Sequence, residues 1–372
     1  MKRIGIIANT SWNILNFRIG LIKEIQKNGH EVIIIAPKDE HAEELKQHGL
    51  PIILVSGLSR KGTNPVKDLM LVFELAKIYK KERLDLVLQY TIKPNIYGSL
   101  AGWLTQTKTV STVTGLGYVF LNKGLSSTIA KRLYQFAFKF SHLVYFQNSD
   151  DQQLFIDSGL VPPQKSRLVH GSGIDTEYFH PDYCSSIPKD SSKITFLMIA
   201  RLLIDKGVYE YVSAAKNIKN KYPNTQFLLL GDQDQGNPAA VKEEDIENIK
   251  NEGIVELLGF KKNTRDFICP SDAIVLPSYR EGIPRVILES FAMAKPCITT
   301  DAPGCKHTVD DGVNGLICKV SNAEDLAEKI EQFILLDDAT KAKMGRNARS
   351  KALEIYSIDK ITKEYLTIID SL

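Results

Sequence analysis

The stretch 275-VLPSYREGIPRVILESFAMAKP-296 joins the two kinds of element from which the whole chain is built. An apolar, strand-like run stops at Pro277, and a helical pattern restarts at Pro284, where the missing N–H of proline costs nothing in the first turn of a helix. Two acidic residues belong to this unit, Glu281 in the turn and Glu289 along the helix. A short apolar strand that leads through a turn into a helix is the repeating unit of an α/β sheet protein.

The same unit recurs on both sides of this stretch. In the second half of the chain, short β-branched runs come at 194–200, 226–231, 254–259, 273–278 and 297–300. In the first half they come at 3–8, 31–37, 51–57, 85–90, 109–114 and 143–149. The runs lack strict polar alternation, which is typical of parallel strands buried on both faces, and helical patterns such as 17–30 fill the gaps. The sequence predicts an α/β fold of two doubly wound, Rossmann-like domains that face each other across a cleft.

The length of the chain supports this division, because 372 residues exceed what one hydrophobic core usually serves. The Pro- and Ser-rich stretch 181-PDYCSSIPKDSSK-193 is typical of a linker. We therefore expect a first domain at 1–182 and a second at 193–356. A final helix is expected within 357–372, and whether it returns to the first domain is left open.

Composition excludes several classes of protein. Hydrophobic residues make up 43% of the chain and charged residues 24%, which indicates an ordered globular protein. The apolar runs are too short for a membrane span or a secretory signal, and the five cysteines form no CxxC pair, so we expect reduced cysteines in a cytoplasmic protein.

Residues 1–180 carry 22 Lys and Arg against 15 Asp and Glu, a net charge of +7. This excess favours an anionic partner such as a diphosphate or a membrane surface, or reflects ordinary solvated helix faces; no nucleic-acid partner is expected.

The helix that starts at Pro284 is a candidate anion site. Gly282 removes side-chain bulk ahead of it, and the first turn of a helix presents backbone N–H groups and the positive end of a dipole. Two cations, Arg201 and Lys206, follow the strand at 194–200 and would reach the same edge of the sheet, where they could neutralise a diphosphate. Ordinary surface cations are the alternative interpretation.

Glu281 and Glu289 would flank a diphosphate bound at this site. A carboxylate accepts two hydroxyl hydrogen bonds at once, which suits the diols of sugars. A nucleotide sugar has a hexose at one end, a diphosphate in the middle and a ribose at the other end. The layout therefore predicts a nucleotide-sugar site, and the alternative is a pair of solvated glutamates on an exposed helix.

At these residues the chain resembles a known enzyme family. Arg201 and Lys206 after a strand, LLG at 257–259, LPSYREGIPRVILE at 276–289 and DGVNGL at 311–316 look like the retaining glycosyltransferases of family four, which have the GT-B fold. The second half resembles the family throughout, and the first half resembles it more loosely through 29-GHEVIIIAP-37. The stretches 16-NFR-18, 114-TGLGYVF-120 and 170-HGSGIDTEYFHP-181 look most like the bacterial enzymes that extend undecaprenyl-diphosphate-linked sugars, including N-acetylgalactosaminyltransferases.

The resemblance implies roles for individual residues. Glu281 would face the donor hexose, Glu289 the ribose hydroxyls, and Arg201 with Lys206 the diphosphate. The implied catalytic residues are Glu281, Arg201 and Lys206. The implied donor-binding residues are Arg201, Lys206, Gly259, Phe260, Glu281, Gly282, Ile283, Pro284, Arg285, Val286 and Glu289. The implied acceptor-binding residues are Asn16, Arg18, Thr114 and Gly115.

The chain departs from the family mainly on the acceptor side. Many members carry a Gly-Gly loop after the first strand and a His in the middle of the first domain, where this chain has 9–16 and 114–115; His307 stands where a Glu is common. Asp232 and Asp234 form an Asp-x-Asp, which binds a metal through the donor diphosphate in other glycosyltransferases. Because side-chain cations and a helix start already balance the diphosphate here, we expect neither a metal nor another cofactor.

The resemblance implies a retaining glycosyltransferase that moves a hexose or N-acetylhexosamine from a UDP-sugar, with UDP-GalNAc as the first candidate. The acceptor would be an undecaprenyl-diphosphate-linked, or other polyprenyl-linked, saccharide at the cytoplasmic face of the membrane, to which the protein would bind peripherally. The helical pattern at 124–144 mixes Lys131, Arg132 and Lys139 with aromatic residues, as does a helix on a membrane surface or a buried crossover helix. The alternatives are a GT-B nucleotide-sugar epimerase or hydrolase that releases UDP without an acceptor, and a non-catalytic glycan-binding scaffold.

Overall fold

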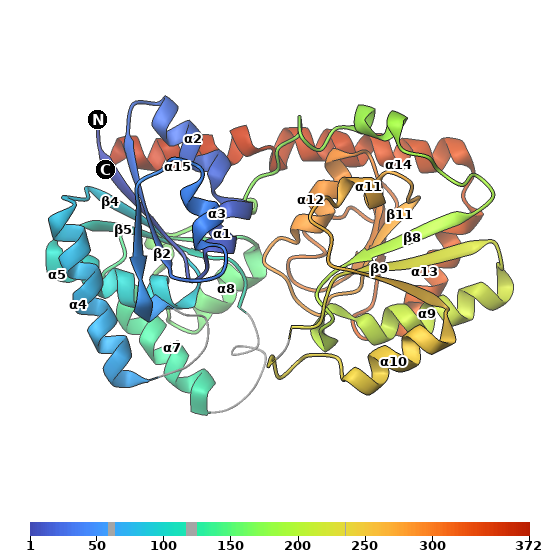
Figure 1. Ribbon diagram of the computed structural model, residues 1–372, viewed down its shortest axis with the longest axis horizontal. Helices are drawn as coiled ribbons and strands as arrows, with labels where there is room; N and C mark the ends of the chain where they lie inside the picture. Colours follow the sequence, from blue (N-terminus) through green and yellow to red (C-terminus); the bar gives the residue numbers. More distant parts are fainter. Residues whose placement is uncertain (59–63, 117–124, 235) are drawn as a thin grey trace. The chain divides into compact units, whose positions relative to one another are not determined.

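The computed structural model describes residues 1–58, 64–116, 125–234 and 236–372, and it divides the chain into two compact units (Figure 1). The first unit comprises Met1–Gly173 together with Ile358–Leu372, and the second comprises Ile174–Ser357. Each unit holds one parallel sheet with its own helices. The predicted α/β class with two Rossmann-like domains is therefore confirmed.

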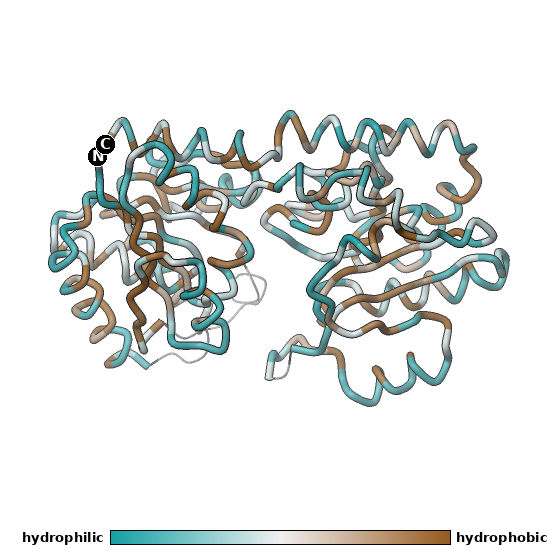
Figure 2. Tube along the Cα trace, turned by 45° about the horizontal axis from the view of Figure 1, so that its top comes forward, coloured by the Kyte–Doolittle hydropathy of each residue, from teal (hydrophilic) through white to brown (hydrophobic). Residues whose placement is uncertain are grey.

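The first unit is built on a seven-stranded parallel sheet in the order β3-β2-β1-β4-β5-β6-β7. Its strands are β1 (Arg3–Ile7), β2 (Glu31–Pro37), β3 (Ile52–Val55), β4 (Leu86–Tyr90), β5 (Lys108–Val113), β6 (Leu143–Phe146) and β7 (Ser166–Leu168). The order reverses between β1 and β4, the switch point of a doubly wound sheet. Figure 2 shows hydrophobic strands in the interior, because helices cover both faces of the sheet.

The helices of the first unit fill the gaps between its strands. They are α1 (Ser11–Phe17), α2 (Ile19–Lys27), α3 (Ala42–Lys46), η1 (Ser56–Leu58), α4 (Pro65–Lys81), η2 (Pro94–Gly98), α5 (Ser99–Thr105), α7 (Leu125–Ala137), α8 (Ser149–Asp157), η3 (Pro163–Lys165) and α15 (Ile358–Ser371). The helix predicted over 17–30 begins only at Ile19. Residues 17 and 18 are not part of α2, because Phe17 is the last residue of α1 and the backbone N–H of Arg18 donates to Ile14 O at 2.9 Å, which closes α1.

The last helix of the chain, α15, belongs to the first unit, which answers the question that the sequence left open. Ile361, Tyr365 and Ile369 are buried in the core that contains β1 and β4. The Tyr365 hydroxyl lies 3.0 Å from Thr112 Oγ1, and Lys2 Nζ donates to Ile369 O at 2.5 Å. The two termini consequently lie side by side in Figure 1.

The second unit is built on a six-stranded parallel sheet in the order β10-β9-β8-β11-β12-β13. Its strands are β8 (Ile194–Ile199), β9 (Thr225–Leu230), β10 (Val255–Gly259), β11 (Ala273–Leu276), β12 (Cys297–Thr300) and β13 (Gly315–Cys318). Its helices are η4 (Pro181–Ser186), η5 (Ile204–Lys206), α9 (Val208–Lys221), α10 (Glu243–Glu252), α11 (Arg265–Ile268), α12 (Arg285–Ala292), α13 (Ala323–Leu335), α14 (Asp338–Lys351) and η6 (Ala352–Tyr356). The order reverses between β8 and β11, so the carboxyl ends of these strands are the expected place for a ligand.

The stretch 181–193, interpreted from the sequence as a linker, packs onto the second unit. Its first turn forms η4, and Cys184 forms a disulfide with Cys269 at the end of α11. The prediction of five reduced cysteines is therefore wrong for this pair, because the fold brings together two residues that are 85 positions apart in the sequence. Cys297, Cys305 and Cys318 are free and buried, as predicted for packing residues.

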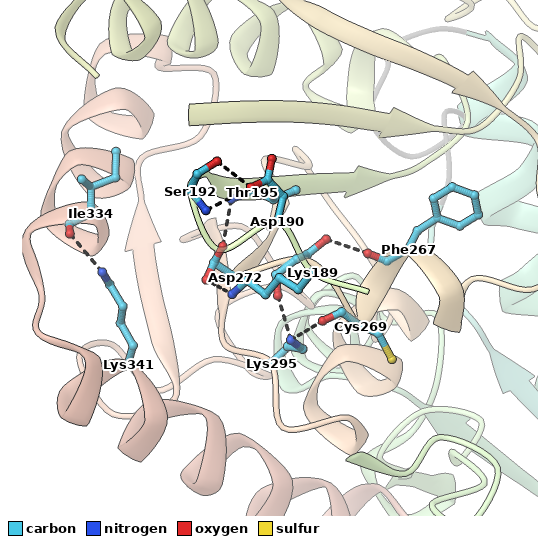
Figure 3. Close-up of polar contacts among 11 residues, drawn as sticks. Lys189, Asp190, Ser192, Thr195, Phe267, Cys269, Asp272, Lys295, Ile334 and Lys341 are labelled. Atoms are coloured by element: carbon cyan, nitrogen blue, oxygen red, sulfur yellow. Dashed lines mark hydrogen bonds and ion pairs between the residues drawn. The ribbon is translucent and has the colours of Figure 1, made fainter. Parts of the chain in front are cut away.

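Lys189, in this stretch, and Lys295 both bind acceptors in the segment 269–272 between α11 and β11 (Figure 3). Lys189 Nζ pairs with Asp272 Oδ1 at 2.6 Å, and Asp272 Oδ2 accepts from the backbone N–H of Thr195 in β8 at 2.9 Å. Lys295 Nζ donates to Cys269 O at 2.6 Å and to Ser271 O at 2.8 Å, so it satisfies carbonyls that follow α11. Burial lowers the pKa of Lys295 to about 8.

Candidate active site

The loops that follow β8 and β11, at the carboxyl edge of the second sheet, approach each other closely at Gly207. This residue has φ +76°, and a Cβ placed on it would lie 2.2 Å from Pro277 O, so a glycine is required both by the backbone conformation and by the close approach. Next to this contact, the backbone N–H of Tyr279 donates to Asp205 O at 2.9 Å. The loop after β8 is thereby fixed to the loop after β11.

This contact brings the predicted residues Lys206 and Glu281 together. Lys206 Nζ pairs with Glu281 Oε1, and both side chains are mostly buried. The same carboxylate oxygen accepts from Ser278 Oγ at 2.9 Å. The Glu281 backbone is also held, because its N–H donates to Pro303 O at 3.0 Å and a Cβ on Gly304 would lie 2.3 Å from Glu281 O. Glu281 is thus fixed through both its side chain and its main chain.

Glu289 lies on α12 and is held by two partners. Arg285 Nε, one helical turn earlier, pairs with Glu289 Oε1 at 3.0 Å, and Thr264 Oγ1 donates to Oε2 at 3.3 Å. Burial raises the pKa of Glu289, and the charge and hydrogen bond of Arg285 act against that rise. Both carboxylate oxygens therefore already have hydrogen-bond donors.

Arg201 follows β8 and reaches toward the loop after β9. Its guanidinium pairs with Asp234, whose Oδ2 also accepts from Asn237 Nδ2 at 3.0 Å. Arg201, Lys206 and Arg285 therefore share one property: each is paired with a carboxylate of its own unit. An anionic ligand that takes these cations must exchange with, or join, an existing ion pair.

Gly259 and Phe260 mark the carboxyl end of β10. Gly259 has φ +67°, and its carbonyl accepts from the Gly231 N–H at 3.0 Å, which ties this end of β10 to the end of β9. The backbone N–H of Phe260 donates to Asp232 Oδ1 at 3.1 Å, and the Phe260 side chain is exposed. The candidate donor residues thus follow the ends of three strands, β10, β8 and β11, and β9 lies between the first two.

The start of α12 differs by one residue from the prediction. Pro284 is the cap residue and the helix begins at Arg285. The cap provides no side-chain acceptor for the first-turn amides, whereas Pro284 O accepts from the Ile287 N–H at 3.0 Å. Gly282 and Pro284 are buried, while the side chains of Ile283 and Val286 are partly exposed. This segment retains the features of an anion site at a helix start.

The two aspartates of the Asp-x-Asp sequence engage protein groups. Asp232 accepts from the Phe260 backbone and Asp234 pairs with Arg201. Across 1–58, 64–116, 125–234 and 236–372, no group of three or more His, Cys, Asp or Glu side chains is arranged to hold a metal ion. His307, noted for its departure from the family pattern, is partly buried, and its carbonyl accepts from Tyr356 OH at 3.1 Å.

The candidate acceptor residues are not gathered by the first unit in the same way. Asn16 is exposed on α1, and its side-chain amide donates to Trp12 O at 2.9 Å. Arg18 is only 2% exposed and lies 3.7 Å above the Tyr90 ring, so its guanidinium is packed in the core. Thr114 and Gly115 follow β5 and are half-buried, and residues 117–120 of the same motif lie outside the described residues. Acceptor contacts by these four residues stay a prediction, and the burial of Arg18 indicates a packing role for its side chain.

The residues that position the two glutamates were not singled out from the sequence. Ser278 lies inside the quoted stretch, where a hydroxyl at a strand end is a weak signal, and Thr264 lies in a different loop from its partner Glu289. Gly304 precedes Cys305 in a stretch without a periodic pattern. Only the folded arrangement shows that all three act on Glu281 or Glu289.

In the part of the chain that the structure describes, no helix has both the length and the apolar character needed to cross a membrane.

The family described as glycosyl transferases group 1 matches residues 182–351, and the family described as glycosyl transferase 4-like matches residues 3–148. These two matches fall in the second and first units, respectively.

Named relatives match most of the chain or nearly all of it. The N,N'-diacetylbacillosaminyl-diphospho-undecaprenol alpha-1,3-N-acetylgalactosaminyltransferase of Campylobacter jejuni is 32% identical, over 99% of this chain and 98% of its own. The UDP-Gal:alpha-D-GlcNAc-diphosphoundecaprenol alpha-1,3-galactosyltransferase of Escherichia coli is 26% identical, over 82% of this chain and 81% of its own. The crystal structure of Anabaena HepE in complex with UDP superposes with a TM-score of 0.81 at 21% identity and covers 100% of both chains, which shows a shared fold.

Proposed function

The chain belongs to the glycosyltransferase group 1 family, with the GT-B fold, and we propose that it transfers a sugar from a UDP-sugar to an undecaprenyl-diphosphate-linked saccharide with retention of anomeric configuration. The transferred sugar is a hexose or N-acetylhexosamine, and UDP-GalNAc is the first candidate donor because the Campylobacter jejuni relative is named as an N-acetylgalactosaminyltransferase. The observation that carries the proposal is the Lys206–Glu281 ion pair just ahead of the start of α12, at the sheet edge where Arg201 also follows β8.

The donor diphosphate binds between Lys206, Arg201 and the first turn of α12 in this proposal. Two cations and a helix start supply positive charge where the leaving diphosphate gains negative charge during transfer. Lys206 is already oriented by Glu281, so its ammonium does not have to be ordered when the donor arrives. Arg201 is more exposed and has to give up part of its contact with Asp234.

Glu281 contacts the donor hexose and Glu289 contacts the ribose hydroxyls in the proposed complex. Glu281 has a fixed backbone and a carboxylate oxygen bound by Ser278, which leaves its orientation well defined. Glu289 sits one turn inside α12, and the charge and hydrogen bond of Arg285 favour the ionised carboxylate, the form that accepts hydroxyl hydrogen bonds. The uracil would border Gly259 and Phe260, whose exposed ring offers a face for stacking.

The reaction needs positioning and charge stabilisation more than a strong base. On the proposed same-face path, the departing diphosphate oxygen takes the proton of the acceptor hydroxyl as the glycosidic bond breaks and the new one forms. No cofactor and no metal take part in this proposal, since the cations of the site supply the charge that a metal would supply.

The acceptor lipid brings the enzyme to the cytoplasmic face of the membrane, where we propose a peripheral association. Both relatives named above are described by names that specify diphospho-undecaprenol acceptors. The first unit, which carries the excess of basic residues, would bind the acceptor.

A donor screen with a defined acceptor tests this function. The purified protein is incubated with UDP-GalNAc, UDP-GlcNAc, UDP-Gal or UDP-Glc and with undecaprenyl-diphosphate-linked N,N'-diacetylbacillosamine, and both UDP and the extended lipid are measured. We expect acceptor-dependent UDP release and a product whose new linkage is α by NMR. UDP release at the same rate without acceptor would indicate an epimerase or hydrolase, and UDP binding without turnover with any donor would indicate a scaffold.

A further inference from the structure

Helix α4 (Pro65–Lys81) is apolar on two opposite faces. Leu71, Val72, Leu75 and Tyr79 point inward and are buried against the first sheet. Val66, Leu69, Met70 and Phe73 follow the spacing i, i+3, i+4, i+7 and are between 58% and 68% exposed, so they form a continuous stripe on the outer surface. A surface helix of a globular protein usually carries polar residues on that side.

The same outer face becomes basic toward the end of the helix. Lys77 and Lys80 continue the stripe, Lys67 and Lys81 flank it, and all four are exposed. The one acidic residue exposed on α4 is Glu74, because Asp68 is buried and binds Lys93 at 3.1 Å and the Tyr97 hydroxyl at 2.9 Å. The outer surface of α4 therefore combines four large apolar side chains with a net positive charge.

The helix at 124–144, which the sequence suggested for a membrane surface, directs most of its aromatic residues inward. Tyr134 in α7 and Phe138 just after it are buried, and Phe136 is the aromatic residue of α7 that is well exposed. Phe140, just after α7, stacks on Trp103 of α5 with ring centroids 4.6 Å apart, and α5 packs against α4 (Figure 1). The described part of this segment thus fits the alternative interpretation of a buried crossover helix.

We propose that α4 is the membrane-docking helix of this protein, lying in the interface of an anionic bilayer with Val66, Leu69, Met70 and Phe73 among the lipid chains and its lysines at the headgroups. An amphipathic helix with apolar and basic residues on its outer face binds such a surface in two ways: its apolar side chains are buried among the lipid chains, and its basic side chains are attracted to the anionic headgroups. The inference rests on the proposed function in one respect, since a polyprenyl-linked acceptor is what makes a membrane contact useful.

Charge favours a bilayer over a second copy of this chain as the occupant of the stripe. A symmetric dimer formed through α4 would bring together two surfaces of the same net positive charge, which opposes association. Anionic lipids instead compensate Lys67, Lys77, Lys80 and Lys81.

Sedimentation with vesicles tests the proposal directly. The full-length protein is mixed, without donor or acceptor, with vesicles of phosphatidylcholine alone, or of phosphatidylcholine with about 40% of the anionic lipid phosphatidylglycerol. We expect binding to the anionic vesicles that weakens as salt is raised. The double variant Leu69→Gln/Phe73→Gln should have a vesicle partition coefficient at least about tenfold below that of the wild type. For Lys77→Gln/Lys80→Gln, vesicle binding should depend much less on salt concentration than it does for the wild type.

A matched control separates the stripe from apolar exposure in general. Leu335, at the end of α13 in the second unit, is 70% exposed, so Leu335→Gln removes an equally exposed leucine and should leave vesicle binding unchanged. Equal losses for Leu335→Gln and Leu69→Gln/Phe73→Gln, or vesicle binding by the double variant at the wild-type level, would overturn the proposal. A lipid-free dimer that dissociates in the double variant would assign the stripe to self-association and would also overturn it.

A transfer assay with a short, water-soluble diphosphate-linked acceptor keeps this inference apart from the proposed function. The Leu69→Gln/Phe73→Gln variant should retain the wild-type rate in that assay, because no residue of the donor site is changed. Vesicle binding by a protein that transfers no sugar would defeat the proposed function alone. Transfer by a protein whose α4 variants bind vesicles normally would defeat the docking inference alone.

Discussion

Lys206 and Glu281, 75 residues apart in the chain, form an ion pair between the loops that follow β8 and β11. Neither residue is a free surface charge, so the sugar end and the diphosphate end of the proposed donor site are coupled through this pair. Arg285 and Glu289 form a second ion pair of the proposed donor site, within α12. A substitution in one partner therefore changes the environment of the other, and the predictions below allow for that.

Removing the cations should lower turnover strongly. Lys206→Ala and Arg201→Ala each remove charge that stabilises the departing diphosphate, and we expect kcat/KM to fall by about 10²-fold or more in each. Lys206→Ala also removes one ion-pair partner of Glu281, so the melting temperature must be measured together with the steady-state rate. Near-normal rates in both folded variants would show that the diphosphate binds elsewhere.

The two glutamates should separate in binding experiments. Glu289→Gln replaces one acceptor oxygen with a donor NH₂, so affinity for UDP and for the intact donor should fall together, by ~1–3 kcal/mol. Glu281→Gln should spare UDP binding and impair transfer, because its contact is with the hexose. Calorimetry with UDP and with the donor distinguishes the two, and an equal loss of UDP affinity in both variants would mean that the ribose and hexose ends are misassigned.

The raised pKa of Glu289 predicts a pH dependence of UDP binding. The ionised carboxylate is the form that accepts the ribose hydroxyls, and it is lost as pH falls through a pKa that burial has moved above its ordinary value. Wild-type affinity for UDP should therefore begin to weaken at a higher pH than an ordinary carboxyl would dictate, whereas Glu289→Gln should lack this step. Binding curves of the same shape for both proteins would count against the assignment.

Chelation should leave most of the activity in place. EDTA removes no charge from Arg201, Lys206 or α12, so the rate with EDTA should stay close to the rate without it. The variant Asp234→Asn tests the same residues in another way, because it weakens the ion pair that holds Arg201. Its affinity for UDP should rise by up to about fivefold, which is the scale of an exposed ion pair. Activity assays with EDTA and UDP titrations of the variant give the two readouts. Complete loss on chelation with recovery in Mg²⁺ or Mn²⁺, together with an inactive Asp234→Asn, would make Asp232 and Asp234 metal ligands instead.

The disulfide between Cys184 and Cys269 should stabilise the second unit. It closes a loop of 85 residues, for which chain entropy gives a contribution of about 4.6 kcal/mol. Cys184→Ser should lower the melting temperature of the oxidised protein to that of the reduced protein. Thiol titration of the unfolded, unreduced wild type should find the three free cysteines, and five thiols would show that the pair is not oxidised.

Much of the fold was predictable because its strands are buried on both faces and their β-branched runs stand out from the helices. Strand β7 escaped because its three residues, Ser-Arg-Leu, form no apolar run and two of them are exposed, and β13 escaped because it begins inside the DGVNGL motif. The Cys184–Cys269 pair gave no signal, since cysteine spacing says nothing about contacts between distant segments. The periodicity of α4 predicts a helix, but only the folded structure shows which of its two apolar faces is covered.

The site divides in the same way. The cations and glutamates could be proposed from one strand-turn-helix stretch and one strand end, because parallel strands bring their carboxyl ends together. The ion pairs that join them, and the hydrogen bonds from Ser278 and Thr264, depend on loop contacts that no local pattern specifies. Arg18 shows the limit on the acceptor side, where a cation near a strand end turned out to be packed against Tyr90.

The membership of α15 in the first unit sets an order of events during translation. The ribosome releases residues 1–173 first, yet the core that they form lacks Ile361, Tyr365 and Ile369 until 358–372 have emerged. The second unit is one uninterrupted segment, 174–357, and all of it leaves the ribosome before α15 does. Of the two units, the one whose synthesis begins first is therefore the last to complete its packing. A nascent chain stopped short of residue 358 would contain the whole second unit, while Tyr90 and Tyr145 of the first unit would still lack the ring of Tyr365.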